Sequence, residues 1–251
     1  MDVLGIDIGG TGIKAAVVDT ETGELKTERY RLETPHPATP AAVIEVVSSM
    51  IKHFDWKKLV GIGFPAAVKH DVVKTASNID SSWVGINAGA EIEKATGCPT
   101  HLINDVDAAG YAEMNFGAGQ DNNANVMVIA VGTGIGTALF SEGTLFANSE
   151  LGFIKVAGVA GEHYAANSVR EKENLSWKQW GKRLNKYLER IESLFYPDLI
   201  ILGGGISKKF EKFEKYINID CEIIPAQMKN NAGIIGAALA ARHRLAEMSE
   251  P

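Results

Sequence analysis

The first fourteen residues contain a turn whose residue types could hold a phosphate. The segment DIGGTGIK places Asp7 ahead of Gly9 and Gly10, with Thr11 and Lys14 following. Glycines let backbone amides approach a bound group closely, and a hydroxyl, an ammonium and a carboxylate in one turn suit a phosphate with a metal ion. The same turn is also consistent with an ordinary glycine-rich hairpin.

Two further glycine clusters have the same character. One, in the segment VGTGIGTALF, again stands between two apolar runs, and the other follows the apolar run 199–202. Glycines between a strand and a helix let a phosphate or a flat ring lie against the backbone. The residues of these clusters are Gly132, Thr133 and Gly134, and Gly203, Gly204 and Gly205. Because a strand, a glycine turn and a strand occur near the start of each half of the chain, we predict an internal duplication.

Amide and carboxylate side chains that could act on a hydroxylated ligand follow predicted strands and loops. Asn104 and Asp105 come directly after the short strand 101–103, and the end of a strand holds a carboxylate rigidly enough for proton transfer. The irregular segment 72–87 contains Asn78, whose amide can both donate and accept hydrogen bonds. That segment is also consistent with a surface loop around a buried tryptophan.

Composition excludes several classes of protein. The chain has 251 residues, 45% of them hydrophobic, and a net charge of −6, which argues against a nucleic-acid or membrane-surface binder. Its two cysteines, Cys98 and Cys221, have no metal-binding spacing, so we expect neither a disulfide framework nor a structural zinc. We see no leader segment and no apolar run long enough to span a membrane, and we expect a cytoplasmic protein.

The elements that must position these residues alternate between strand and helix. The pattern predicts a meander of three strands with the third over 25–32, then a helix over 40–53 with Thr39 as its N-cap. Strand 59–64, a helix over 88–96 that ends at Gly97, and a helix starting at Asp105 complete the first half. The second half is predicted to contain strands 125–131, 199–202 and 222–225 and a helix from residue 231.

One predicted helix of the second half is strongly amphipathic. Over 176–194 it has an apolar stripe and a basic opposite face. The cations of that face are Lys178, Lys182, Arg183, Lys186 and Arg190. Such a row of charges is usually a solvated surface, but it could also attract an extended anion.

These motifs, taken in order, resemble those of a known family. DIGGTGIK, IND at 103–105, VGTGIGTALF and LGGGISKK are similar to segments of the ROK family of sugar kinases, within the actin-like ATPase superfamily. Within the family, segments such as ENLSWKQWGKRLNKYL and NNAGIIGAAL most resemble the polyphosphate glucokinases. Most of the family carries a cysteine-rich zinc loop before the position of Glu162, whereas this chain has AGVAGEHYAANS.

The resemblance implies a two-lobed α/β fold of ribonuclease H-like type, with duplicated mixed-sheet domains and a cleft between them. The expected lobes are 1–108 and 109–231, with the C-terminal helix 232–248 packing back on the first lobe. The resemblance also implies a homodimer.

The resemblance further implies a role for each motif. Asp105 matches the catalytic base that takes the proton from the sugar hydroxyl, and Asp7 matches the residue that holds Mg²⁺. The sugar-contacting positions are Asn78, Asn104, Asp105, Glu150 and Glu162. The first two glycine turns, with Thr11 and Lys14, match phosphate-binding hairpins, and Gly203–Gly205 matches the adenosine-side loop. Phosphoryl transfer depends on alignment and charge neutralisation, which such turns can supply.

One position departs from the family pattern. The family motif is Glu-x-Gly-His, but here Glu150 is followed by Leu151, Gly152 and Phe153. The chain is therefore expected to be a kinase that transfers a phosphoryl group from polyphosphate or ATP to the 6-hydroxyl of glucose. Two alternatives stay open: an ATP-dependent kinase for another hexose or an N-acetylhexosamine, and a catalytically silent sugar-binding regulator. The spacing of His163 gives no reason to regard it as a substitute for the missing imidazole.

Overall fold

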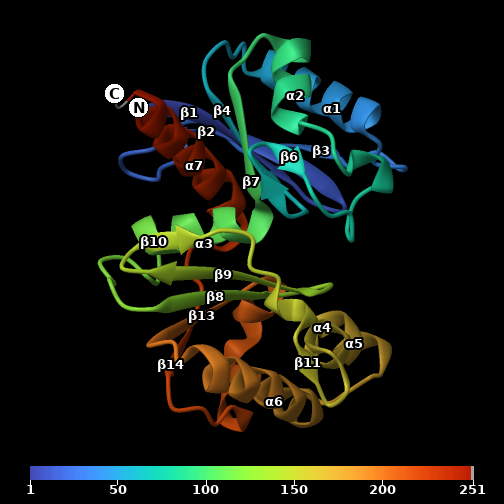
Figure 1. Cartoon of the computed structure of the whole chain (residues 1–251), viewed down its shortest axis with the longest axis vertical. Coiled ribbons are helices and arrows are strands. Elements are labelled where there is room, and N and C mark those ends of the chain that lie inside the picture. The colour runs from blue at the N-terminus through green and yellow to red at the C-terminus, as the bar shows by residue number, and fades with distance from the viewer. Residues whose placement is uncertain (250–251) are drawn as a thin grey trace. The chain divides into compact units, whose positions relative to one another are not determined.

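The computed structural model describes residues 1–249, which divide into two compact units (Figure 1). The first unit contains residues 1–116 and 230–249, and the second contains residues 117–229. The sequence-based boundary after residue 108 falls inside helix α3 (Asp105–Phe116), and this helix belongs as a whole to the first unit.

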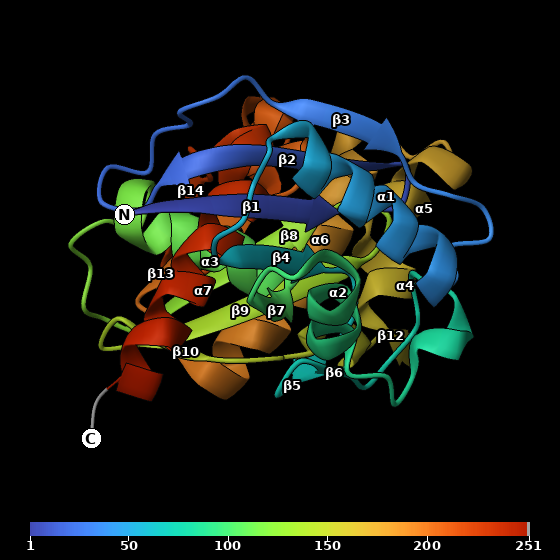
Figure 2. The same ribbon diagram turned by 90° about the horizontal axis from the view of Figure 1, so that it is seen from above.

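The first unit is built on a five-stranded mixed sheet in the order β3-β2-β1-β4-β7. The first three strands pair antiparallel, and β1, β4 and β7 pair parallel. Figure 2 shows β3, β2, β1 and β4 following one another across the sheet. The strands are β1 (Asp2–Ile8), β2 (Gly12–Asp19), β3 (Tyr30–Glu33), β4 (Val60–Phe64) and β7 (Thr100–Asn104). Strand β3 is shorter than the strand predicted over 25–32, because residues 25–29 form an isolated bridge and bends instead.

Helices cover this sheet. Helix α1 (Pro40–His53) packs with α2 (Ala88–Thr96), and α3 packs with the C-terminal helix α7 (Ala232–Ser249), which also contacts β1 and β4. The approach of α7 to the sheet requires glycine: a Cβ at Gly5 or Gly61 would overlap backbone carbonyls of α7. Apolar side chains of β1, β2, β4 and α1 form the core of the unit.

The second unit repeats this arrangement. Its sheet has the order β10-β9-β8-β13-β14, again with an antiparallel meander joined to parallel strands. The strands are β8 (Val126–Val131), β9 (Ile135–Ser141), β10 (Thr144–Phe146), β13 (Leu199–Gly203) and β14 (Glu222–Pro225). The same strand order and direction in both units support the duplication that the glycine turns predicted.

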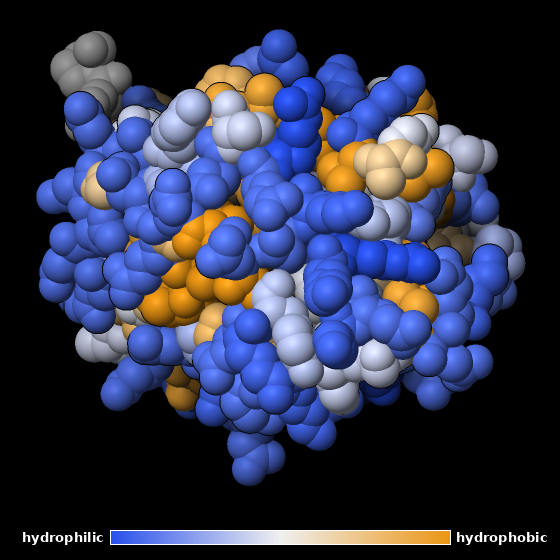
Figure 3. Space-filling model, turned by 90° about the horizontal axis from the view of Figure 1, so that it is seen from below, coloured by the Kyte–Doolittle hydropathy of each residue, from blue (hydrophilic) through white to orange (hydrophobic). Residues whose placement is uncertain are grey.

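The helices of the second unit begin with α4 (Gly161–Ala165) and α5 (Asn167–Lys172), which precede the long helix α6 (Trp177–Phe195). A capping box between Ser176 and Gln179 starts α6, and Trp180 and Leu184 of its apolar stripe are fully buried. The face of the molecule seen in Figure 3 is mostly hydrophilic, with separate apolar patches.

Short elements complete both units. Residues after Gly204 form a 3₁₀ helix, η3 (Gly205–Lys212), with non-helical backbone at Lys209. Thr39 occupies the N-cap of α1 as predicted, but its side chain makes no capping hydrogen bond. The remaining elements are β5 (Val68–Lys69), β6 (Val72–Val73), β11 (Lys155–Val156), β12 (Val159–Ala160), η1 (Ser81–Trp83), η2 (Leu151–Phe153), η4 (Glu214–Tyr216) and η5 (Lys229–Asn231). Among the described residues, no helix is long and apolar enough to cross a membrane.

Candidate active site

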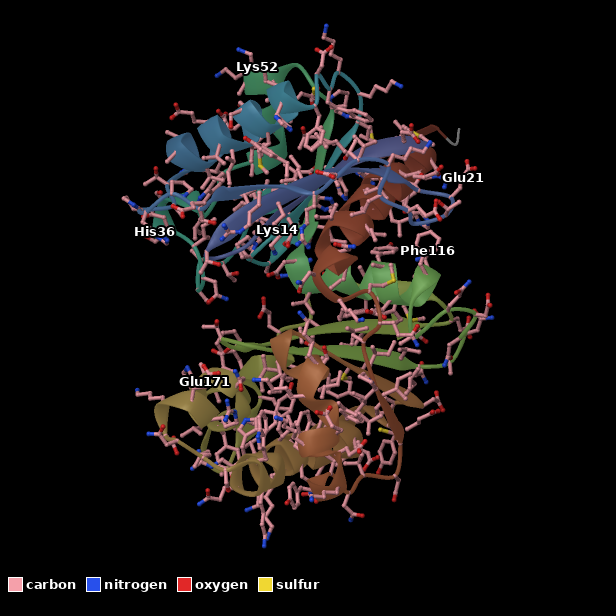
Figure 4. The ribbon with its side chains drawn as sticks, turned by 180° about the vertical axis from the view of Figure 1, so that it is seen from behind. Lys14, Glu21, His36, Lys52, Phe116 and Glu171 are labelled. Carbon is pink, nitrogen blue, oxygen red and sulfur yellow. The ribbon has the colours of Figure 1, made fainter. Side chains whose placement is uncertain are left out.

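The first glycine turn connects β1 and β2 and carries an ion pair at its base. Asp7 and Lys14 are directly opposite in the hairpin ladder, and Lys14 Nζ lies 3.0 Å from Asp7 Oδ2. Both side chains are mostly buried, so the pair is only partly screened by solvent. At the tip of the turn, the amide of Gly9 donates to the carbonyl of Gly12. Figure 4 shows Lys14 among the strands of the first unit.

Residues of β3 and the loop that follows it support this turn from outside. The Thr34 hydroxyl donates to the Gly9 carbonyl at 2.5 Å, and the Arg31 guanidinium donates to the Thr11 carbonyl at 2.9 Å. A Cβ on Gly12 would overlap the Arg31 side chain, so that cation lies directly against the turn. Sequence reasoning missed Arg31, although its place opposite Lys14 in the β2–β3 ladder puts a second cation on this sheet.

The carboxylate of Asp7 is suited to hold a magnesium ion. A Cβ on Gly233, at the start of α7, would lie 2.9 Å from the Asp7 carboxyl carbon, so the carboxylate sits at the positive end of that helix. The described residues contain no group of three or more potential metal ligands. Mg²⁺ commonly binds through one or two carboxylates, substrate phosphates and water, so a single carboxylate beside a phosphate-type turn agrees with its requirements.

The end of β7 positions Asp105 through a cap. Asn104 Oδ1 accepts hydrogen bonds from the amides of Val106 and Asp107 at 2.9 and 3.0 Å, and its Nδ2 donates to the carbonyl of Ala66 at 3.1 Å. Asn104 thus starts α3 and ties it to the loop after β4. Asp105, the first residue of α3, is partly buried, and its Oδ1 accepts from the Val106 amide at 2.9 Å.

A pocket of about 370 Å³ lies beside the first glycine turn, within the first unit. It brings together Gly9, Gly10 and Asn78, three residues singled out from the sequence. His36, labelled in Figure 4, also lines it and was not predicted. Asp80, from the same polar segment 72–87 as Asn78, lines it too. The remaining lining residues are Ile8, Thr34, Pro37, Ala38, Pro65, Ser77 and Ile79. A pocket of this size, with polar groups from several loops, is suited to a small hydroxylated ligand.

Asp80 remains a carboxylate at this pocket. Its Oδ1 accepts hydrogen bonds from the hydroxyl and the amide of Ser82, and these bonds lower the pKa of Asp80 below its ordinary value. No sequence motif marks His36, because it lines the pocket only through the fold of its loop.

In the second unit, the other two glycine clusters lie side by side. Gly203 is paired with Ala130 in the parallel ladder, and a Cβ on Gly204 would overlap the carbonyl of Val131. The carboxyl ends of β8 and β13 therefore present both turns at one edge of the sheet. The hydroxyl and amide of Ser168 bind the carbonyls of Thr133 and Gly132 at 2.5 and 3.2 Å, which holds the second turn against α5.

Glu162 and Glu150 stand beside the second turn. Glu162 Oε2 accepts from the Ile135 amide at 3.4 Å, and a Cβ on Gly134 would lie 2.5 Å from that oxygen. Desolvation and the neighbouring Glu162 charge raise the pKa of Glu150, although the residue is exposed. His163 Nε2 lies 3.6 Å from Glu162 Oε1, but its side chain is 70% exposed.

Two aromatic residues complete the description of this region. Phe153, which stands where the family pattern has histidine, lies in η2 and is 49% exposed. Tyr187 of α6 packs its ring against Gly161 and is fully buried. Within residues 1–249 its hydroxyl has no hydrogen-bond partner, and burial together with the Glu162 charge raises its pKa. Sequence reasoning placed Tyr187 only in the apolar stripe.

The duplicated sheets and their glycine turns define the class of protein: a two-domain α/β protein of the actin-like ATPase fold. A crystal structure of the inorganic polyphosphate/ATP-glucomannokinase from Arthrobacter sp. strain KM superposes with a TM-score of 0.92 and 40% identity, covering 97% of this chain and 99% of that chain. A ROK family glucokinase from Streptomyces griseus, solved with glucose and AMPPNP, has the same fold at a TM-score of 0.82 and 24% identity, covering 97% and 100%.

Sequence comparison gives the family. Residues 3–162 match the model of the ROK family. The polyphosphate glucokinase of Mycobacterium tuberculosis is 43% identical over 241 residues, which are 94% of this chain and 90% of that protein. The polyphosphate glucokinase of Mycobacterium leprae is 40% identical, with 94% of this chain and 74% of that protein covered. The chain belongs to the ROK family.

Proposed function

We propose that this ROK protein is a glucokinase that transfers a phosphoryl group from inorganic polyphosphate or ATP to the 6-hydroxyl of glucose. One observation carries the proposal: Asp105 stands at a rigid strand end, in a chain that matches polyphosphate glucokinases over nearly its whole length. Asn104 ties Asp105 to the loop after β4, whose Pro65 lines the pocket beside Gly9 and Gly10.

Asp105 acts as the general base. Its carboxylate accepts the proton of the sugar 6-hydroxyl while that oxygen attacks the terminal phosphorus, and the bond from this phosphorus to the bridging oxygen of the donor breaks. The products are a sugar 6-phosphate and a donor shortened by one phosphoryl group. General-base assistance of this kind contributes about 10²- to 10⁴-fold to the rate.

The sugar is held by amide and carboxylate side chains. In the first unit, Asn78 lines the pocket, and in the second unit, Glu150 and Glu162 stand beside the second turn; each is a hydrogen-bonding group of the kind that binds sugar hydroxyls. Carboxylates accept from two hydroxyls at once, which makes them suitable partners for a polyol. Because three bonds already occupy the Asn104 side chain, its main contribution is to position Asp105.

The donor phosphates are held by backbone amides and cations. In the first unit, the first turn with Lys14 supplies groups for the donor phosphates, and in the second unit, the second turn and Gly203–Gly205 do so. Asp7 would hold Mg²⁺, which would supply positive charge to neutralise the phosphate oxygens. Homodimeric assembly and a cytoplasmic location, both expected from the sequence, complete the proposal.

A panel of donors and sugars tests the function. Purified protein with Mg²⁺ is assayed with polyphosphate or ATP against glucose, mannose, fructose and N-acetylmannosamine, with sugar phosphate detected by a coupled enzyme. Mannose is included because the Arthrobacter relative is a glucomannokinase. Turnover of glucose with either donor supports the proposal. Turnover of another sugar with ATP alone would indicate the hexose kinase alternative. Calorimetric glucose binding without any turnover would indicate a regulator.

A further inference from the structure

A cluster of cations surrounds the indole of Trp177 at the start of α6. The guanidinium carbon of Arg170 lies 4.3 Å from the ring centroid, and the ammonium groups of Lys209 and Lys212 lie 5.8 and 5.9 Å from it. Phe213 stacks on the same indole with a centroid distance of 6.0 Å and an interplanar angle of 20°. We call Arg170, Trp177, Lys209 and Lys212 the Trp177 cluster. Three separate elements, α5, α6 and η3, contribute to it.

The two lysines of the Trp177 cluster have no anionic partner. Among residues 1–249, no carboxylate lies within ion-pair distance of Lys209 or Lys212, and both are exposed. Arg170 is partly engaged, since it donates to Asn167 at 3.0 Å and lies 3.4 Å from Glu171. Cation–π contacts hold such side chains in place without neutralising them. Three cations collected around one indole therefore repel one another unless an anion binds.

The segments around the Trp177 cluster add to its positive charge. Residues 167–186 and 205–215 contain ten Lys and Arg against four Asp and Glu, in a chain whose net charge is −6. The nearby Arg183 is paired with Glu173 at 2.7 Å, but the lysines of the exposed α6 face have no such partner in the described chain. Positive charge is thus concentrated on one part of an acidic protein, and this can draw in a polyanion.

The Trp177 cluster is continuous with both glycine turns of the second unit. Ser168, two residues before Arg170, binds the carbonyls of Gly132 and Thr133. On the other side, Lys209 and Lys212 belong to η3, which starts directly after Gly204. A chain of anionic groups leaving the phosphate turns can therefore continue onto the cluster within the same unit.

We propose that the Trp177 cluster is a binding subsite for the distal phosphates of an extended polyphosphate donor. This inference rests on the proposed function and assigns the part of the donor that lies beyond the transferred and adjacent phosphates. Polyphosphate is favoured over a nucleotide base as the ligand, because Arg170 and Phe213 already contact the half-buried indole, whereas the ammonium groups of Lys209 and Lys212 are exposed. The affinity of the protein for polyphosphate should then increase with chain length, since a triphosphate offers few distal charges.

The test uses the full-length double variant Lys209→Gln/Lys212→Gln. The matched control is Lys57→Gln/Lys58→Gln, which removes the same charge in the first unit, where Lys58 lies 5.8 Å from the Trp56 centroid. Steady-state kinetics are measured with long-chain polyphosphate, tripolyphosphate and ATP. We expect the KM for long-chain polyphosphate to rise about tenfold, the effect of losing exposed charge-assisted contacts. The KM values for ATP and glucose should change by less than about twofold, and the control should resemble wild type.

A direct binding measurement separates this inference from the proposed function. Long-chain polyphosphate is titrated into wild type and both variants by calorimetry without glucose. If wild type phosphorylates no sugar but binds polyphosphate, and only the 209/212 variant binds more weakly, the proposed function fails and the subsite stands. Three outcomes would each overturn the subsite. They are an equal rise in KM for all donors, an equal effect in the control variant, and unchanged polyphosphate binding in the 209/212 variant.

Discussion

The backbone of Gly204 lies directly against the carbonyl of Val131. Two glycine turns that are far apart in the sequence of the second unit are therefore in contact. Gly204 has φ of +78°, in the region that favours glycine, and a Cβ there would overlap the Val131 backbone. Val131 is the last residue of β8, and Gly132 follows it at once. The position of one glycine cluster therefore sets the position of the other.

The first prediction concerns this contact. Gly204→Ala should lower the free energy of unfolding by about 2 kcal/mol or more, because it adds both a steric overlap and an unfavourable backbone conformation. Gly205→Ala is the matched control, since a Cβ at Gly205 meets nothing within 4 Å and its φ is not positive. Chemical denaturation followed by circular dichroism measures both. Equal stability of the two variants would contradict the close contact.

The second prediction concerns the base. Asp105→Asn should lower kcat by about 10²- to 10⁴-fold with either donor, because an amide cannot accept the hydroxyl proton. Calorimetry should still detect glucose binding. The exposed Asp220 offers a control, and Asp220→Asn should leave kcat unchanged. Activity of the Asp105 variant near the wild-type rate would show that another group is the base.

The third prediction concerns the ion pair at the first turn. Lys14→Gln removes the cation 3.0 Å from Asp7, and with it a positive charge next to the donor phosphates. We expect kcat/KM to fall with both polyphosphate and ATP, by about tenfold or more, the effect of one lost charge-assisted contact. The affinity for glucose alone should not change. A loss restricted to polyphosphate would contradict a role for Lys14 with both donors.

The fourth prediction restores the imidazole of the family pattern. The half-exposed position of Phe153 can accept a smaller polar ring without leaving a buried cavity, so Phe153→His should fold normally. If this position faces the sugar, one added hydrogen bond should lower the KM for glucose by about three- to tenfold. Steady-state kinetics measure this change, with Phe153→Leu as the control for loss of the aromatic ring. An unchanged KM would mean that residue 153 does not contact the sugar.

The fifth prediction concerns pH. Desolvation and the Glu162 charge raise the pKa of Glu150 in the folded protein, although the residue is exposed, so its ionisation slightly destabilises the fold as the pH rises through that raised pKa. Glu150→Gln should therefore increase the midpoint of thermal unfolding at neutral pH. The gain should shrink as the pH falls toward the ordinary glutamate range, where the wild-type carboxyl is protonated in both states. A gain that stays constant across this pH range would exclude the pKa shift as its cause.

Local patterns in the sequence determined much of this protein. The glycine turns, the strands that flank them and helix 88–96 with Gly97 as its C-cap were predicted because turn chemistry and apolar periodicity are local properties. The apolar stripe of α6 and the similarity to ROK kinases were likewise readable from the residues. The end of the first unit at residue 116, and not at 108, was not readable, since the packing of α3 with α7 decides it.

Only the tertiary structure decided which distant side chains share a site. His36 and Asp80 reach the pocket of Asn78, and Arg31 reaches the first turn, through loops and strand pairing that no motif records. Likewise, Lys209 and Lys212 meet Trp177 because η3 packs beside α6. Residue spacing specifies which face of an element is apolar, but contacts between elements depend on how those faces pack. The sequence therefore determined the family and its chemistry, while the fold determined the neighbours on which specificity for the donor and the sugar depends.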